Sequence, residues 1–267
     1  MHKNDLSLKR RFSSLTSSYS DRFSKLINKR PGTRILLYHS VGSRLKHDTY
    51  GISISARSFE EQVRTIAGDK SVRLVPLTSL MNLSEWKQCN TCSIAVTFDD
   101  GYKDNLYAAA PILIDYRVPF TLFVTVGFLG EASSVFLSKN ELKRLSGMAG
   151  VTVGSHGMTH SRLTRMDDKS LRSELMQSRA RIEDIIGKKV EMLSYPFGKV
   201  DHRVVSAAIE TGYRLGAGSR FGNNFNDTNR MVLKRTEIWR DDSKKVFCQK
   251  YKGSWDWYGY YQRLRGL

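Results

Sequence analysis

The chain has 267 residues, with 43 Lys and Arg against 26 Asp and Glu, so its formal net charge is +17. Its 40% hydrophobic and 10% aromatic content excludes a wholly disordered protein, because this apolar surface can offset the entropy of the chain. The apolar runs are shorter than the ~20 residues that a membrane-spanning helix needs, and three cysteines do not form a disulfide framework. We therefore expect a globular protein without an integral membrane segment.

Basic residues are concentrated at the start of the chain, where residues 1–34 contain nine Lys or Arg and two Asp. Apolar residues recur there at spacings of three and four, which predicts an amphipathic helix. We favour a segment that packs on its own domain or stays partly disordered, and the alternative is that it lies on an anionic membrane. The basic residues also interrupt each candidate signal peptide. We expect a cytoplasmic protein, with contact to the inner membrane face left open and no nucleic-acid partner.

Strands and helices alternate after residue 32. The predicted strands are Arg34–Tyr38, Ser93–Phe98, Phe120–Val126, Val151–Gly154, Met192–Tyr195, Tyr213–Ala217 and Val232–Ile238. Four helices are predicted. The first begins at a capping box at Ser58, the second runs from Gly101 to about Tyr116, the third spans Asp167–Ile186, and the fourth extends from Asp201 to Gly212. This order implies parallel strands with right-handed crossovers. We expect an α/β fold, a distorted (β/α) barrel of about seven parallel strands.

Cys89 and Cys92 form a C-x-x-C pair just before one predicted strand. Such a pair can be half of a zinc site or a redox pair, but no second pair lies nearby. We favour the simpler interpretation that these are small residues leading into a buried strand.

Polar residues stand where predicted strands end: His39, Asp99-Asp100, His156 and Tyr195. In parallel α/β barrels these ends carry the active site. His156 and His160 are spaced to lie on one face of a helical turn and to share a metal, with Asp99 or Asp100 as a third ligand. Two adjacent carboxylates are unfavourable unless a cation or hydrogen bonds compensate. A solvated turn is the alternative.

Three strings carry a resemblance to a known family: Thr97–Tyr102 (TFDDGY), Gly154–His160 (GSHGMTH) and Ser194–Gly198 (SYPFG). In order and spacing they resemble the polysaccharide deacetylases, the NodB-homology domain of carbohydrate esterase family 4. The string LLYHS, ending at Ser40, is similar to the circularly permuted poly-N-acetylglucosamine deacetylase subgroup. The resemblance covers residues 33–247, which we expect to be the catalytic domain. We expect residues 1–32 to be a basic extension, helical or flexible, and residues 248–267 to be an aromatic basic tail.

The resemblance implies a NodB-like barrel that removes N-acetyl, occasionally O-acetyl, groups from sugars with a divalent metal, usually Zn²⁺. Asp99 matches the general base. Asp100, His156 and His160 match the metal ligands. The backbone N–H of Phe197 matches the oxyanion donor.

Two further residues are assigned by the same resemblance. His39 is the candidate general acid, because no histidine follows His202; a buried histidine bonded to backbone is the alternative. Arg235 is expected to brace Asp99, with a surface arginine as the alternative. Gly157 stands where the family usually has Ser or Thr, so we expect one bracing hydrogen bond to be missing.

Two questions stay open at this point. The aromatic residues of the tail can stack on sugar rings or pack as a C-terminal cap. The chain itself can be a sugar deacetylase or a catalytically silent relative that binds glycans or a membrane surface. The pattern of residues leaves the identity of the sugar undetermined.

Overall fold

The computed structural model describes residues 31–264 except positions 44, 46–47, 83–91 and 131–134. The predicted basic helix and Cys89 lie outside the described residues, so the membrane contact and the interpretation of the C-x-x-C pair stay predictions. Within the described ranges, no helix combines the length and the apolar character needed to cross a membrane.

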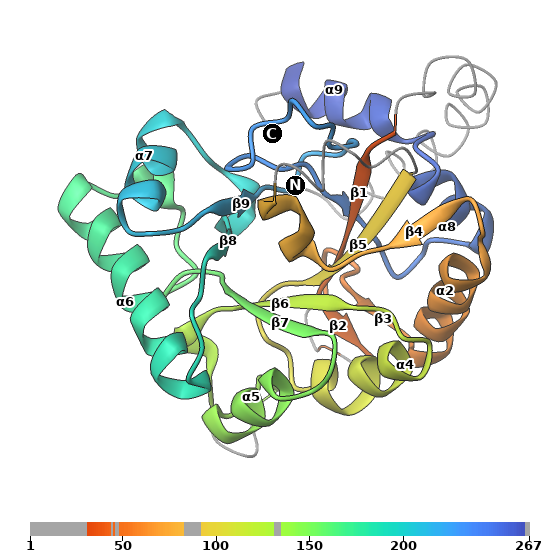
Figure 1. Cartoon of the computed structure of the whole chain (residues 1–267), viewed down its shortest axis with the longest axis horizontal. Helices are drawn as coiled ribbons and strands as arrows, with labels where there is room; N and C mark the ends of the chain where they lie inside the picture. The colour runs from red at the N-terminus through yellow and green to blue at the C-terminus, as the bar shows by residue number, and fades with distance from the viewer. Residues whose placement is uncertain (1–30, 44, 46–47, 83–91, 131–134, 265–267) are drawn as a thin grey trace.

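Parallel strands dominate the fold (Figure 1). The strands are β1 (Thr33–Tyr38), β2 (Ser40–Val41), β3 (Ser53–Ile54), β4 (Val72–Leu74), β5 (Cys92–Phe98), β6 (Phe120–Val124), β7 (Val151–Ser155), β8 (Met192–Ser194), β9 (Leu215–Ala217) and β10 (Thr236–Glu237). The helices are α2 (Ala56–Gly68), α4 (Ala110–Asp115), α5 (Lys139–Ser146), α6 (Asp168–Ile186), α7 (His202–Glu210), α8 (Lys244–Tyr251) and α9 (Asp256–Leu264). Short 3₁₀ segments and one π-helical segment, Asn105–Ala109, join them.

The main sheet has the order β10-β1-β5-β6-β7-β8-β9, with β4 added beside β5, and every pair is parallel. Its outer strands approach each other, because Ala217 in β9 forms a parallel bridge with Leu233, shortly before β10. Helices surround this curled sheet in Figure 1. The predicted distorted barrel of about seven parallel strands is confirmed.

Alternate residues of each strand enter two different apolar clusters. Leu36 and Val96 pack with helix residues such as Phe59, whereas their neighbours Ile35 and Ala95 join a second cluster with side chains from the other strands. Burial on both faces explains why the strands are near-continuous apolar runs. Each large side chain buried in this way stabilises the fold by roughly 1.5–3 kcal/mol.

Several helices and strands begin or end at other residues than predicted. Helix α2 begins at Ala56 rather than at a capping box on Ser58, because the Ser55 hydroxyl accepts the Ser58 N–H and caps the helix earlier. The last predicted strand is shorter than expected, with only Thr236–Glu237 paired in β10. Helix α6 is as predicted, with Asp167 as its N-cap and Gly187, at φ 68°, as its C-cap.

The C-terminal segment packs against the barrel. Helix α8 runs across residue 248, where the tail was expected to begin. Trp255 is 1% exposed and packs with Phe221 and Trp239, as a cap rather than as a free stacking surface. Both Arg34 Nη atoms donate to the Asp256 carboxylate, at 2.8 and 3.0 Å, which fastens α9 to β1.

Candidate active site

The predicted site residues follow the carboxyl ends of neighbouring strands. His39 follows β1, Asp99 and Asp100 follow β5, and His156 follows β7. Because all of these strands are parallel, their carboxyl ends lie at the same edge of the sheet. The fold therefore brings together residues that are more than a hundred positions apart in the sequence, as expected for a barrel of this kind.

Asp100, His156 and His160 form a compact cluster, in which one potential ligand atom from each lies within 4.8 Å of the others. Asp100 Oδ1 is 3.5 Å from His156 Nε2 and 3.3 Å from His160 Nε2. Asp99 is at the border of the cluster, with Oδ2 3.7 Å from His156 Nε2. Of the two aspartates that sequence reasoning left as ligands, Asp100 is the one that joins both histidines.

The loop that carries the histidines is not the helical turn that their spacing suggested. Residues 156–160 have no helical hydrogen bonds, and both Gly157 (φ 84°) and His160 (φ 58°) are left-handed. A helix requires negative φ at every residue, so this backbone is incompatible with it. The two rings nevertheless converge, with centroids 5.0 Å apart.

The donor set suits a divalent cation. Asp100 Oδ1 is buried without a hydrogen-bond partner among the described residues, an arrangement that costs free energy unless something binds it. The Ser194 carbonyl accepts a hydrogen bond from His156 Nδ1 at 2.8 Å. The lone pair on Nε2 is then available to bind a metal. Burial and the neighbouring His156 lower the pKa of His160, favouring the neutral imidazole that binds metals.

Backbone strain is concentrated at these residues. Among the described residues, four that are not glycine have positive φ, and three of them are Asp100 (74°), His160 (58°) and Phe197 (60°). Such conformations cost about 1–3 kcal/mol each and persist where the surrounding structure enforces them. Their coincidence with the predicted site residues points to a functional site at this edge.

Asp99 is held by a buried network. Arg235 Nη1 and Nη2 donate to its two carboxylate oxygens at 2.8 and 2.7 Å, and the Ser194 hydroxyl donates to Oδ2 at 2.9 Å. Arg235 is 1% exposed and so is not a surface arginine. Burial alone would raise the pKa of Asp99, but the charge of Arg235, followed by that of His156, holds it well below its usual range. The carboxylate is therefore ionised and fixed in orientation.

His39 lies near this network. Its charge contributes to lowering the pKa of both Asp99 and His160. Its Nδ1 atom is buried and has no hydrogen-bond partner among the described residues, unlike a histidine satisfied by backbone. Its carbonyl oxygen accepts a hydrogen bond from Asn105 Nδ2 at 2.8 Å, which links the end of β1 to the π-helical segment.

The turn after β8 exposes Phe197. This residue is 50% exposed, and its ring lies 4.7 Å from the His160 ring, with the Arg162 guanidinium 5.2 Å above it. The next residue, Gly198, has φ 66°, and a Cβ there would be 1.9 Å from Ser219 Oγ. Glycine is therefore required to hold the turn that positions the Phe197 backbone.

Sequence reasoning missed several residues around the site. The Phe128 ring stacks on Phe136 at 4.7 Å and lies 5.4 Å from the His160 ring, which forms an aromatic wall beside the cluster. Glu174, on α6, contacts the histidine loop. The sequence signal that could have pointed to Glu174 is its position: it is a charged residue beside the apolar positions 171 and 175, on the buried face of an amphipathic helix.

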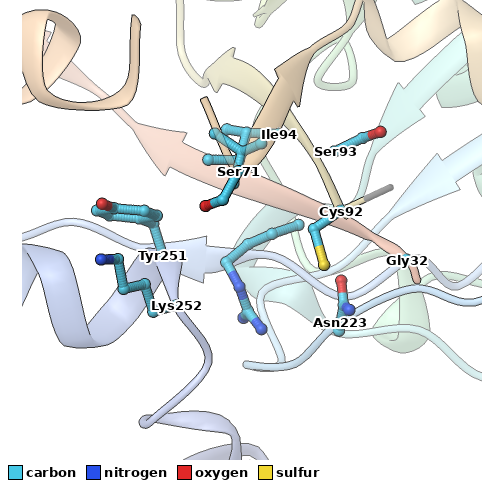
Figure 2. Close-up of a pocket in the computed structure, with 10 residues that line it drawn as sticks. Gly32, Ser71, Cys92, Ser93, Ile94, Asn223, Tyr251 and Lys252 are labelled. Atoms are coloured by element: carbon cyan, nitrogen blue, oxygen red, sulfur yellow. The ribbon is translucent and has the colours of Figure 1, made fainter. Parts of the chain in front are cut away.

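A pocket of about 300 Å³ lies elsewhere (Figure 2). Its lining includes Gly32, Ser71 and Cys92, at or before the amino ends of β1, β4 and β5. These ends face away from the edge that carries Asp100, His156 and His160, so the pocket is separate from the candidate site.

Comparisons with known proteins agree with the motifs. The family model for polysaccharide deacetylase matches residues 87–216. The putative polysaccharide deacetylase YxkH of Bacillus subtilis is 25% identical over 204 residues, which cover 76% of this chain and 70% of that protein. The poly-beta-1,6-N-acetyl-D-glucosamine N-deacetylase of Staphylococcus aureus is 22% identical over 175 residues, 61% of this chain and 60% of that enzyme.

Solved structures show the same fold. The Streptococcus pyogenes deacetylase PplD, in complex with acetate, matches with a TM-score of 0.73 at 20% identity, over 83% of this chain and 99% of that one. IcaB from Ammonifex degensii matches with a TM-score of 0.70 at 20% identity, over 84% and 98%. The barrel, the motifs at its strand ends and the family match lead to one conclusion: the chain contains a polysaccharide deacetylase domain of the NodB type.

Proposed function

We propose that the chain is a metal-dependent hydrolase that removes N-acetyl groups from an N-acetylated sugar in a polysaccharide, oligosaccharide or glycan precursor. The observation that carries the proposal is the buried, unpartnered Asp100 Oδ1, 3.5 and 3.3 Å from the Nε2 atoms of His156 and His160. One carboxylate and two histidines are a ligand set suited to Zn²⁺, with coordination positions left for water and substrate.

Asp100, His156 and His160 would hold the cation, which, when bound, supplies Lewis acidity toward the acetyl carbonyl and the attacking water. Asp99 accepts the proton of that water. Its lowered pKa makes it a weak base that stays ionised, so it needs a water made more acidic by its surroundings. A cation held by Asp100, His156 and His160 would supply that acidity.

The developing oxyanion is stabilised by the backbone N–H of Phe197, which its left-handed turn holds at the same edge. His39 donates a proton to the leaving amine, and Asn105 fixes its backbone through the His39 carbonyl. Arg235 and Ser194 orient Asp99 so that one carboxylate face stays toward the cluster. Phe128 and Phe197 provide aromatic faces beside His160 on which a sugar ring can stack.

The name of one relative supports a first choice of substrate. The Staphylococcus aureus relative is named for poly-beta-1,6-N-acetyl-D-glucosamine, so β-1,6-linked N-acetylglucosamine oligomers are the first substrate to test. The full chain, depleted of metal and reloaded with Zn²⁺, should release acetate from these oligomers. An O-acetylated sugar ester tests the occasional ester activity in parallel.

A His160→Ala variant separates this proposal from a silent relative. It should lose both the bound zinc and acetate release while keeping the fold, because His160 lies outside the apolar clusters. A wild-type protein that binds zinc stoichiometrically but releases no acetate from any N-acetylated glycan would favour the silent relative instead.

A further inference from the structure

The histidine loop is braced through its backbone. Its three middle N–H groups all donate hydrogen bonds: Gly157 N to Ser155 Oγ at 3.1 Å, and Met158 N and Thr159 N to Glu174 Oε1 at 2.8 and 2.7 Å. On the other side, Met158 O accepts the Gly127 N–H at 2.7 Å. The bracing bond that the glycine at position 157 seemed to remove is thus supplied by other residues.

Glu174 contributes most of this bracing. The same Oε1 atom also accepts the Thr159 hydroxyl at 3.0 Å, so a single carboxylate oxygen receives three hydrogen bonds. Glu174 is only 7% exposed, and within the part of the chain that the structure describes it forms no ion pair. A buried carboxylate without a cation is costly unless hydrogen bonds compensate, so its place on α6 is explained by these three bonds.

Gly157 allows the close approach of the carboxylate. Its φ is 84°, and a Cβ at this position would lie 3.1 Å from Glu174 Oε1. Any side chain here would therefore meet both an unfavourable backbone conformation and the carboxylate. The loop and the helix are fitted to each other through this contact.

His160 follows the braced residues directly and has φ 58°. A non-glycine residue keeps this conformation only where its neighbours are fixed. We infer that Glu174 is a positioning residue for the metal site, holding the loop so that the Nε2 atoms of His156 and His160 converge on Asp100 Oδ1. The inference rests on the proposed function, since it concerns the same metal site.

The test compares two glutamates of the same helix. Glu183, also on α6, accepts the Val190 N–H at 2.8 Å and the Arg179 Nε at 3.1 Å, so it braces another loop in a similar way. Glu174→Ala and Glu183→Ala are prepared in the full chain, together with Glu174→Gln. Co²⁺ is titrated into each metal-free protein, the dissociation constant and the visible absorption spectrum are recorded, and the thermal midpoint of the metal-free protein is measured.

Both alanine variants should lower the thermal midpoint, but only Glu174→Ala should weaken Co²⁺ binding, by about 10- to 100-fold, and alter the spectrum. Glu174→Gln keeps an acceptor oxygen and should lose less affinity than Glu174→Ala, and it serves alone if the alanine variant does not fold. Unchanged affinity in both Glu174 variants, or an equal loss in Glu183→Ala, overturns the inference. A wild-type chain that does not bind Co²⁺ overturns the proposed function itself, and with it the role of Glu174.

Discussion

Arg235 and Asp99, 136 positions apart, form a two-pronged ion pair in the interior of the protein, with Nη–Oδ distances of 2.8 and 2.7 Å. The pair couples the segment before β10 to the end of β5, and so ties the late part of the chain to the predicted catalytic motif. Because both partners are buried, their geometry is fixed far more tightly than that of a surface pair.

Arg235→Lys keeps the positive charge but loses the planar fork that holds both oxygens. Asp99 should then shift within the site, and kcat/KM for acetate release should fall by up to about 10²-fold, as expected for a misplacement of about 1 Å. The zinc content should be unchanged, since Arg235 contacts none of Asp100, His156 or His160 among the described hydrogen bonds.

Arg34→Lys is the matched control. Arg34, near the start of β1, makes the same kind of two-pronged contact with Asp256 at the start of α9. The variant should lower the thermal midpoint and leave kcat/KM near the wild-type value. Equal losses of kcat/KM in the two variants would assign the effect of Arg235 to general stability.

Substitution of the two adjacent aspartates should have different effects on activity and on zinc binding. Asp99→Asn removes the proposed base and should lower kcat by about 10²–10⁴-fold with zinc still bound. Asp100→Asn removes the negatively charged ligand between the two histidines and should weaken zinc binding itself. Zinc affinity is measured by competition with a chelator, and activity at saturating zinc. Indistinguishable zinc affinities for the two variants would show that base and ligand have been assigned to the wrong residues.

Much of this arrangement could be predicted from the sequence because its signals are local. The apolar runs that end in TFDDG and GSHGMTH fix both the strands and the residues that follow them, and parallel strands bring those residues to one edge. Spacing alone misjudged the backbone between His156 and His160, since the positive φ at Gly157 depends on contacts with other segments.

Other contributions depend on packing that no local pattern reports. Glu174 acts on the histidine loop only because α6 lies across β7, and as a helix residue it looks like an ordinary acidic side chain. Asn105, the first residue of the π-helical segment after β5, donates to the His39 carbonyl across 66 positions of the sequence, and no local pattern reports that contact. The N-cap of α2 was misplaced by three residues, because Ser55 and Ser58 are both good capping residues and only the tertiary structure selects one.

The stability of the protein should depend on pH through Glu141. This residue completes the capping box of α5, accepting the Ser138 N–H at 2.8 Å, and it also accepts the Tyr107 hydroxyl at 2.9 Å. Burial alone would raise the pKa of Glu141, but the hydrogen bonds from Ser138 and Tyr107 lower it from 4.5. Because the folded pKa lies below the unfolded one, the stabilisation is present above the unfolded pKa and is lost as the pH falls through the folded pKa.

Glu141→Gln keeps an acceptor oxygen for the Ser138 N–H but removes the negative charge from the first turn of α5. It should therefore lower the free energy of unfolding near pH 7 by about 0.3–1 kcal/mol. The difference from wild type should shrink as the pH falls through the lowered pKa of the folded protein, because the wild-type carboxyl then becomes protonated and neutral. Urea denaturation at neutral pH and over a series of acidic pH values measures it. A difference that stays constant with pH would mean that the charge of Glu141 contributes nothing.

The turn at Phe197 allows the backbone role of this residue to be tested apart from its side chain. The proposed donor to the oxyanion is the N–H, and glycine keeps it while accepting φ 60° without the cost of a Cβ. Phe197→Gly should therefore retain kcat within about tenfold of wild type, with a larger rise in KM because the ring beside His160 is lost.

Gly198→Ala is the counterpart, since its Cβ would collide with Ser219 Oγ and displace the turn. It should lower kcat by about 10²–10³-fold, the usual cost of losing one oxyanion donor. Both variants are compared by kcat and KM for acetate release, with zinc content measured to verify that the cluster is intact. A loss of kcat in Phe197→Gly as large as that in Gly198→Ala would mean that the ring, and not the N–H, is what the reaction requires at this position.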